Sequence, residues 1–101
     1  MDDERLVLVA RLKVREETIE EAKSLALGMV ADSRSEEGCL NYDVHQGADD
    51  PTVFVWHETW ADREAFNEHL EKPYFKDFLA RASLLAAEEP QIILTKMISE
   101  K

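Results

Sequence analysis

Four stretches of the chain have the spacing of apolar residues that is typical of β-strands. They lie at residues 6–15, 39–46, 52–60 and 92–98. The second and third, CLNYDVHQ and TVFVWHETW, are separated by Gly47–Pro51, whose Gly, Asp and Pro residues favour a turn. We therefore expect these two strands to pair as an antiparallel hairpin.

Apolar residues recur at helical spacing in the segments between these strands. The predicted helices span residues 18–35, 62–70 and 73–88. Thr18 and Glu21 have the spacing of a capping box, and Gly38 is suited to stop the first helix. Asp62 is a candidate N-cap for the second, and Pro73 separates the second from the third.

The element order is therefore β-α-β-β-α-β, with the last helical region in two parts. This order predicts an α+β fold of the ferredoxin-like type, with one antiparallel sheet and its helices on one face. A chain of 101 residues is too short for two hydrophobic cores, so residues 1–101 should form a single domain.

The charge of the chain limits its partners. Twelve Lys and Arg against twenty-two Asp and Glu give a formal net charge of −10, which disfavours nucleic acid and anionic membranes. No apolar run approaches the roughly 20 residues that span a bilayer. The acidic start, Met1–Arg5, is unlike a signal peptide, and the single cysteine, Cys39, suggests a reducing compartment. We expect a cytoplasmic domain.

Both faces of the predicted sheet carry apolar residues. In the third strand Phe54 and Trp56 lie on one face while Val53 and Val55 lie on the other. Helices can cover only one face, so the second should meet a cavity, another subunit or both. This favours a homodimer, although long charged side chains that shield a modest apolar face are an alternative.

The sequence offers little for a metal or a cofactor. His45, His57 and His69 are twelve residues apart, which matches no zinc motif, and the three glycines form no phosphate-binding loop. We therefore expect no metal and no cofactor. Cys39 reads as a structural thiol.

Two residues with polar side chains stand among apolar ones. His69 shares a helix face with Ala65 and Phe66, so it should point inward, either as a proton acceptor or as a hydrogen-bonded core residue. Glu58 shares the strand face of Trp60, where a carboxylate needs a partner. An arginine is the expected partner, and a role in a pocket is the alternative.

Three short patterns carry a family resemblance. They are S-R-x-E-x-G-C-L-x-Y at 33–42, E-x-W at 58–60 and A-F-x-x-H at 65–69. Together they resemble the antibiotic biosynthesis monooxygenase (ABM) domain family. The resemblance implies a dimeric α/β barrel with a cavity between sheet and helices in each subunit. Some members of this family are cofactor-independent monooxygenases that oxidise quinols or polyphenols with molecular oxygen. Others degrade haem, isomerise a phosphorylated signalling molecule or have no known activity.

The resemblance assigns expected roles to individual residues. His69 becomes the catalytic base, and the candidate contacts to a small aromatic or quinol-like substrate are Asn41, Tyr42, Glu58, Trp60 and Phe66. Asn41 and Tyr42 lie on opposite faces of one strand, so only one can face a given cavity. The haem-degrading branch is disfavoured, because Leu79 stands where that branch has its iron ligand. Tyr74 replaces a second histidine that is common in the family. An isomerase acting on a small carbonyl compound and a non-catalytic binding dimer remain alternatives.

Overall fold

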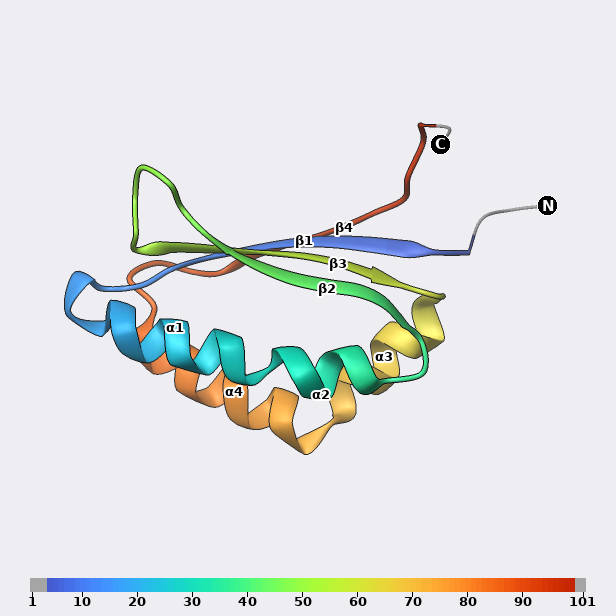
Figure 1. The fold of residues 1–101 in the computed structure, drawn as a ribbon, viewed down its shortest axis with the longest axis horizontal. Coiled ribbons are helices and arrows are strands. Elements are labelled where there is room, and N and C mark those ends of the chain that lie inside the picture. The colour runs from blue at the N-terminus through green and yellow to red at the C-terminus, as the bar shows by residue number, and fades with distance from the viewer. Residues whose placement is uncertain (1–3, 100–101) are drawn as a thin grey trace.

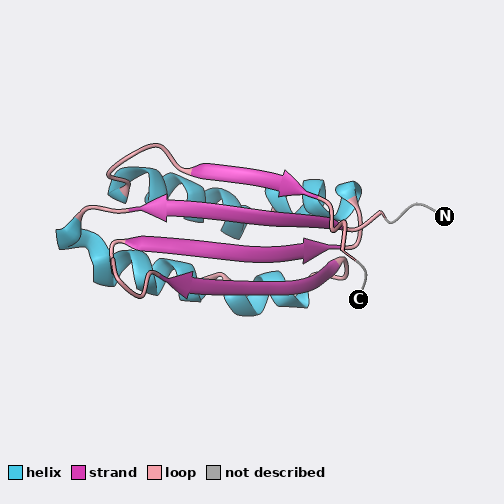
Figure 2. Ribbon diagram, turned by 90° about the horizontal axis from the view of Figure 1, so that it is seen from above, coloured by secondary structure: helices cyan, strands magenta, loops and turns pink. Residues whose placement is uncertain are grey.

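The computed structural model describes residues 4–99 as a four-stranded antiparallel sheet whose helices all lie against one face (Figure 1). In chain order the elements are β1 Leu6–Lys13, η1 Glu16–Thr18, α1 Ile19–Gly28, α2 Val30–Ser35, β2 Cys39–Gln46, β3 Val53–Trp60, α3 Arg63–Glu71, α4 Pro73–Leu85 and β4 Gln91–Thr95. Figure 2 shows the opposite face of the sheet, across which no helix runs.

The strand order is β2-β3-β1-β4, and all three pairings are antiparallel. This arrangement confirms the predicted α+β ferredoxin-like fold. The two central strands, β1 and β3, are joined in sequence through the first helical region and the hairpin, and they pair along their whole length from Leu6↔Trp60 to Lys13↔Val53. The described ends of the chain lie at the same end of the sheet (Figure 1).

The core fills the layer between the sheet and the helices. Alternate residues of β1 and β3 face the helices, so that Leu8 lies opposite Glu58 and Leu12 opposite Phe54. Buried apolar residues of both the sheet and the helices complete this core. Those from the sheet and from α3 include Leu6, Val14, Tyr42, Trp56, Trp60 and Phe66, and those from the other helices include Ala22, Ala26, Met29, Ala82 and Leu85.

Several predicted details are wrong. The first strand ends at Lys13 rather than at residue 15, and the last helix ends at Leu85 rather than at residue 88. The single helix expected over 18–35 is broken at Met29, next to the weak helix former Gly28, into α1 and α2. The capping box is also absent, because the Thr18 hydroxyl donates instead to the carbonyl of Arg15, the residue before η1. The last strand ends at Thr95 rather than at residue 98, since its partner strand β1 has only Leu6 left to pair.

The predicted start of α3 and the break before α4 are confirmed. The Asp62 carboxylate accepts a hydrogen bond from the Ala65 amide at 2.8 Å, which satisfies one of the free amides of the first turn. Helix α3 ends at Glu71, and Pro73 is the first residue of α4. Proline is tolerated there because a first-turn amide has no helical partner.

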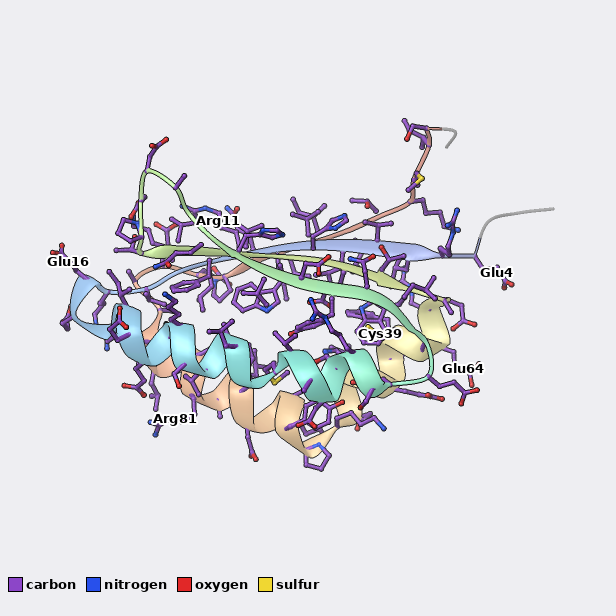
Figure 3. The ribbon with its side chains drawn as sticks, viewed as in Figure 1. Glu4, Arg11, Glu16, Cys39, Glu64 and Arg81 are labelled. Carbon is purple, nitrogen blue, oxygen red and sulfur yellow. The ribbon has the colours of Figure 1, made fainter. Side chains whose placement is uncertain are left out.

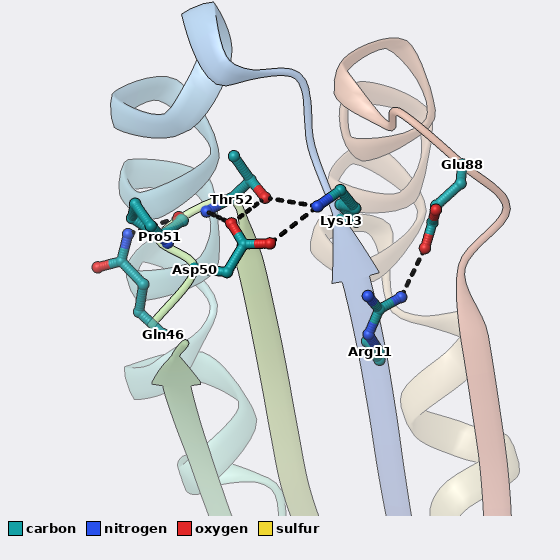
Figure 4. A network of polar contacts seen from close by, with 7 residues as sticks. All are labelled: Arg11, Lys13, Gln46, Asp50, Pro51, Thr52 and Glu88. Carbon is teal, nitrogen blue, oxygen red and sulfur yellow. Dashed lines mark hydrogen bonds and ion pairs between the residues drawn. The ribbon is translucent and has the colours of Figure 1, made fainter. Parts of the chain in front are cut away.

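Polar contacts fix the turn between β2 and β3 to the end of β1 (Figure 4). The Asp50 carboxylate accepts from the Thr52 amide at 3.0 Å and pairs with the Lys13 ammonium at 2.8 Å. These contacts hold the pKa of Asp50 well below its ordinary value. On the other side of β1, Arg11 pairs with Glu88 at 2.6 Å and so ties β1 to the segment that leads into β4.

Gly38 is expected to be required for the contact between the β2 entrance and α3. A Cβ atom at this position would overlap the Cβ of Ala65, whereas a Cβ at Gly28 would meet nothing within 4 Å. Gly38→Ala should therefore lower the free energy of unfolding by about 1–3 kcal/mol, measured by urea denaturation. Gly28→Ala is the matched control and should raise it by up to about 1 kcal/mol through helix propensity. Equal stabilities of the two variants would contradict this prediction.

Candidate active site

A cavity lies between the sheet and the helices α3 and α4. Its walls are mainly apolar, formed among others by Leu8, Leu12, Trp56, Phe66, Phe75 and Phe78. Exposed residues also line it, notably Leu79 on α4 and Ile92 on β4, so the cavity opens between these two elements. The side chains that fill the layer between the sheet and the helices are drawn in Figure 3.

His69 forms part of the inner wall. Helix α3 directs it toward the sheet, and the residue is only 2% exposed, which confirms the predicted inward orientation. Its ring lies 4.5 Å from the ring of Trp60 and 5.0 Å from that of Phe75, measured between centroids. The imidazole is thus held between aromatic rings from β3 and α4.

Glu36 holds one nitrogen of this imidazole. Its Oε2 lies 2.7 Å from His69 Nδ1, and its side chain is only 8% exposed. The same oxygen accepts a hydrogen bond from the hydroxyl of Tyr74. Because a carboxylate can only accept, this contact places the imidazole proton on Nδ1 and leaves Nε2 as the free acceptor.

Glu36 is a site residue that the sequence pattern alone did not predict. It lies in the quoted run of residues 33–42, but 33 positions separate it from His69 in the chain. The available signal was indirect, since an inward histidine among apolar residues needs a hydrogen-bond partner. Tyr74, a departure from the family pattern, has its hydroxyl placed against Glu36 in the structure.

Glu58 is a buried carboxyl on the cavity wall. It is 6% exposed, and its Oε1 accepts a hydrogen bond from the indole nitrogen of Trp60 at 2.9 Å. The predicted arginine partner is wrong, because within residues 4–99 Glu58 forms no ion pair. Burial without a cation raises the pKa of Glu58, the hydrogen bond from Trp60 lowers it, and the nearby charge of Glu36 raises it, so that the pKa is about 7.

The remaining predicted substrate contacts fall on both sides of the sheet. Tyr42 is 2% exposed and lines the cavity, where burial keeps its pKa well above the ordinary value. Asn41 is on the opposite face, where its amide donates to the backbone carbonyl of His57 at 3.0 Å. The structure therefore brings Tyr42, Glu58, Phe66 and His69 together in the cavity wall, with Trp60 packed behind His69 and Asn41 apart from them.

Cys39 lies outside this wall and is half-buried. Burial, followed by the charges of Glu58 and Glu36, raises the pKa of its thiol to about 11. The thiol is thus protonated and a poor nucleophile at neutral pH. Among the residues that the structure describes, no group of three His, Cys, Asp or Glu side chains is placed to hold a metal ion. In the same part of the chain, no helix has the length and apolar character needed to cross a bilayer.

Comparison with known proteins decides the family. A model of the family described as antibiotic biosynthesis monooxygenase matches residues 5–81. The chain belongs to this family. Among curated relatives of this ABM domain, "Putative monooxygenase YcnE" of Bacillus subtilis is 34% identical, over 91% of this chain and 97% of its own length. "Uncharacterized protein sll1783" of Synechocystis is 30% identical over 94% of this chain, which spans 65% of that longer protein.

Solved structures agree with the family fold. Protein PA3566 of Pseudomonas aeruginosa superimposes with a TM-score of 0.88 at 28% identity, covering 94% of this chain and 95% of that one. Rv0793 of Mycobacterium tuberculosis gives a TM-score of 0.90 at 24% identity, covering 95% and 97%. These likenesses confirm the ferredoxin-like arrangement of the ABM domain.

Glu58 should make the stability of the protein depend on pH. Its folded pKa of about 7 exceeds the ordinary value of 4.5, so the folded state keeps a proton that the unfolded chain loses first. Its contribution to stability is full below pH 4.5 and falls by about 3 kcal/mol as the pH rises through 7. Glu58→Gln should therefore gain stability relative to the wild type between pH 5 and 8.5, measured by urea unfolding. Parallel curves for the two proteins would show that Glu58 titrates normally.

Proposed function

We propose that this ABM domain is a cofactor-independent monooxygenase that oxidises a quinol or polyphenol-type molecule with molecular oxygen. The observation that carries the proposal is the imidazole of His69, held at Nδ1 by Glu36 and built into the wall of an apolar cavity. Membership of the family and the names of its relatives support the reaction class. The quinol-type substrate is our own inference.

The reaction needs one proton acceptor and a site shielded from water. His69 Nε2 takes the proton of a phenolic hydroxyl, and Glu36 stabilises the resulting imidazolium at Nδ1. The phenolate transfers one electron to oxygen, and the superoxide and substrate radical combine to form a carbon–oxygen bond. The peroxide anion so formed takes the proton held on His69 and becomes a hydroperoxide. Its O–O bond then breaks, and the outer oxygen leaves as hydroxide, which takes the proton from the ring carbon that carries the peroxide and departs as water. The other oxygen remains on the ring as a carbonyl, and the substrate is oxidised by four electrons in all.

The neighbouring aromatic residues would position the ring of the substrate. Tyr42 and Phe66 line the cavity beside His69, while Trp60 supports the imidazole from behind. Aromatic side chains suit a flat apolar substrate because rings stack or meet edge to face. Asn41 is left out of this assignment, because its side chain lies on the other side of the sheet.

A second candidate function is favoured by Glu58. A buried carboxyl and an imidazole in one cavity wall could act as acid and base in the isomerisation of a small carbonyl compound. A cavity that binds without reacting is the third candidate. Oxygen uptake separates the monooxygenase from both, because neither alternative consumes oxygen.

The substitution of His69 tests the monooxygenase. With 1,4-dihydroxynaphthalene as the substrate, His69→Ala should lower the turnover of oxygen by about 10²–10⁴-fold, because the base is lost. Glu36→Gln should lower the turnover by a smaller factor, since Nε2 remains but the tautomer of the imidazole is no longer fixed. Uptake is measured with an oxygen electrode after subtraction of the enzyme-free rate. With ¹⁸O₂, one labelled atom should appear in the quinone product.

His45→Ala is the control for this experiment. His45 is exposed, and the structure places it on β2 outside the cavity wall, so its loss should change turnover by no more than about a few-fold. If His69→Ala keeps wild-type turnover, His69 is a structural residue. If the wild type consumes no oxygen above the enzyme-free rate, the monooxygenase proposal fails for this substrate class.

We also propose that the protein is a homodimer formed through the uncovered face of the sheet. This face carries Val7, Val9, Val53, Val55 and Ile93, of which Val9 is 37% and Ile93 56% exposed. No helix crosses it in Figure 2. A second copy would remove these side chains from water. The cytoplasmic location stays a prediction, supported by the free thiol of Cys39.

The dimer is tested by light scattering coupled to gel filtration. At micromolar concentration the wild type should elute at twice the mass of the 11.6 kDa chain. Val9→Glu, which places a charge within the apolar face, should elute as a monomer. The matched control is Leu27→Glu, because Leu27 is an exposed apolar residue on α1, away from the sheet face. A monomeric wild type would overturn the dimer.

A further inference from the structure

Glu58 has one oxygen that the described structure leaves without a partner. It lies on β3 between Leu8 of β1 and Tyr42 of β2, and its Oε1 is taken up by the Trp60 indole at 2.9 Å. Within residues 4–99 the other oxygen, Oε2, has no hydrogen-bond partner. It is not fully buried, because Ser33 Oγ is the atom there that is both fully buried and without a partner. Since Glu58 lines the cavity, this oxygen faces its open space.

The surroundings of Glu58 favour the neutral acid. The titratable groups around it are His69 from α3, Glu36 after α2, Tyr74 from α4, and Tyr42 and Cys39 from β2, while β1 contributes the apolar Leu8. Arg11 of β1 also lines the cavity, but it lies opposite Val55 rather than Glu58, and its guanidinium is paired with Glu88. Within residues 4–99 no lysine or arginine pairs with Glu58, and a buried carboxylate without a cation is costly. Burial accordingly raises its pKa to about 7, so below neutral pH the group carries its proton.

Trp60 connects this acid to the proposed base. Its indole nitrogen donates to Glu58, while its ring packs against the ring of His69 at 4.5 Å between centroids. The carboxyl and the imidazole are therefore neighbouring polar points on a wall that is otherwise mainly apolar. A ligand whose hydroxyl binds one of these two side chains can therefore place a second polar group against the other.

We propose that Glu58 is a substrate-binding residue that donates a hydrogen bond, as a neutral carboxylic acid, to a second oxygen of the substrate. The site then selects an uncharged ring that carries one hydroxyl for His69 and another oxygen for Glu58, as a quinol does. A ring bearing a carboxylate near Glu58 is rejected, because no cation there balances the charge. The proposal rests on the proposed function for the role of His69 and adds the rule by which the substrate is recognised.

Two phenols of nearly equal shape test the hydrogen bond. 4-Methoxyphenol has an ether oxygen where 4-ethylphenol has a methylene group, and both stay uncharged between pH 6 and 8.5. The wild type should bind 4-methoxyphenol about five- to tenfold more tightly at pH 6, as expected for one hydrogen bond in a cavity. At pH 8.5 this preference should disappear, because ionised Glu58 only accepts. Dissociation constants are measured by calorimetry, and their ratio cancels any pH effect of His69 on the shared hydroxyl.

Glu58→Gln is the matched variant for this test. Its amide carbonyl can still accept from Trp60 while its NH₂ group donates into the cavity, so the preference should persist at both pH values. Glu58→Leu should lack it at both. Far-UV circular dichroism checks that the variants are folded, and the wild-type comparison between the two pH values tests the proposal without any variant.

Three results would overturn this inference. They are a wild-type preference that does not change with pH, a Gln variant that loses its preference as the wild type does, and the absence of saturable binding of both phenols. The binding experiment consumes no oxygen, so it is independent of turnover. A pH-dependent preference without oxygen uptake would keep the role of Glu58 and reject the monooxygenase, and the opposite pair of results would do the reverse.

Discussion

The contact between His69 Nδ1 and Glu36 Oε2 joins the parts of the fold that form the inner end of the cavity. Glu36 follows α2, His69 belongs to α3, and Tyr74, which donates to the same carboxylate, lies in the first turn of α4. Apolar packing fixes the distance between a helix and the sheet. It restricts the rotation of the helix about its own axis only weakly. A buried hydrogen bond has a defined direction, so this one fixes how α3 and α4 present their residues to the cavity.

In the proposed reaction, the charges around this contact decide which substrate oxygen becomes an anion. A phenolate beside His69 faces an imidazolium that Glu36 stabilises from the other side. An oxygen beside Glu58 has no base to take its proton, because the neutral carboxyl already carries one and no cation there balances an anion. The two polar points of the wall are therefore not equivalent, although both can hold a proton. In the proposed function, this arrangement would orient a substrate that has two similar oxygens, because only one of them can lose its proton at low cost.

The fold could be predicted from the sequence because each helix and strand is marked by the spacing of apolar residues within its own segment. The period of the apolar residues gives the elements, and their order leaves few topologies. Because side chains alternate along a strand, the sequence also predicts that Asn41 and Tyr42 face opposite sides of β2. Which of them meets the cavity follows only from the pairing of Tyr42 with Glu58 in the structure. The helix break at Met29 was missed because the apolar spacing continues through it, with Ala26 and Met29 both buried.

The partners of the buried polar groups could not be predicted in the same way. Glu36 and His69 meet across 33 residues, and no spacing rule connects a loop after one helix with the interior of another. For Glu58 the general rule that a buried carboxylate needs a cation gave the wrong partner, because the alternative to pairing is to keep the proton. The indole of Trp60, two residues away on the same face, satisfies one oxygen and leaves the charge unbalanced.

Strand β4 relates the cavity to the uncovered face of the sheet. Successive residues of a strand point to opposite faces, so Ile92 lines the mouth of the cavity while its neighbour Ile93 lies on the other side. Both are more than half exposed, because β4 is an edge strand that pairs only with β1. A surface that packs on Ile93 would also restrict the backbone that carries Ile92. The mouth of the cavity and the outer face thus share one short edge strand, whose neighbouring residues serve one surface each.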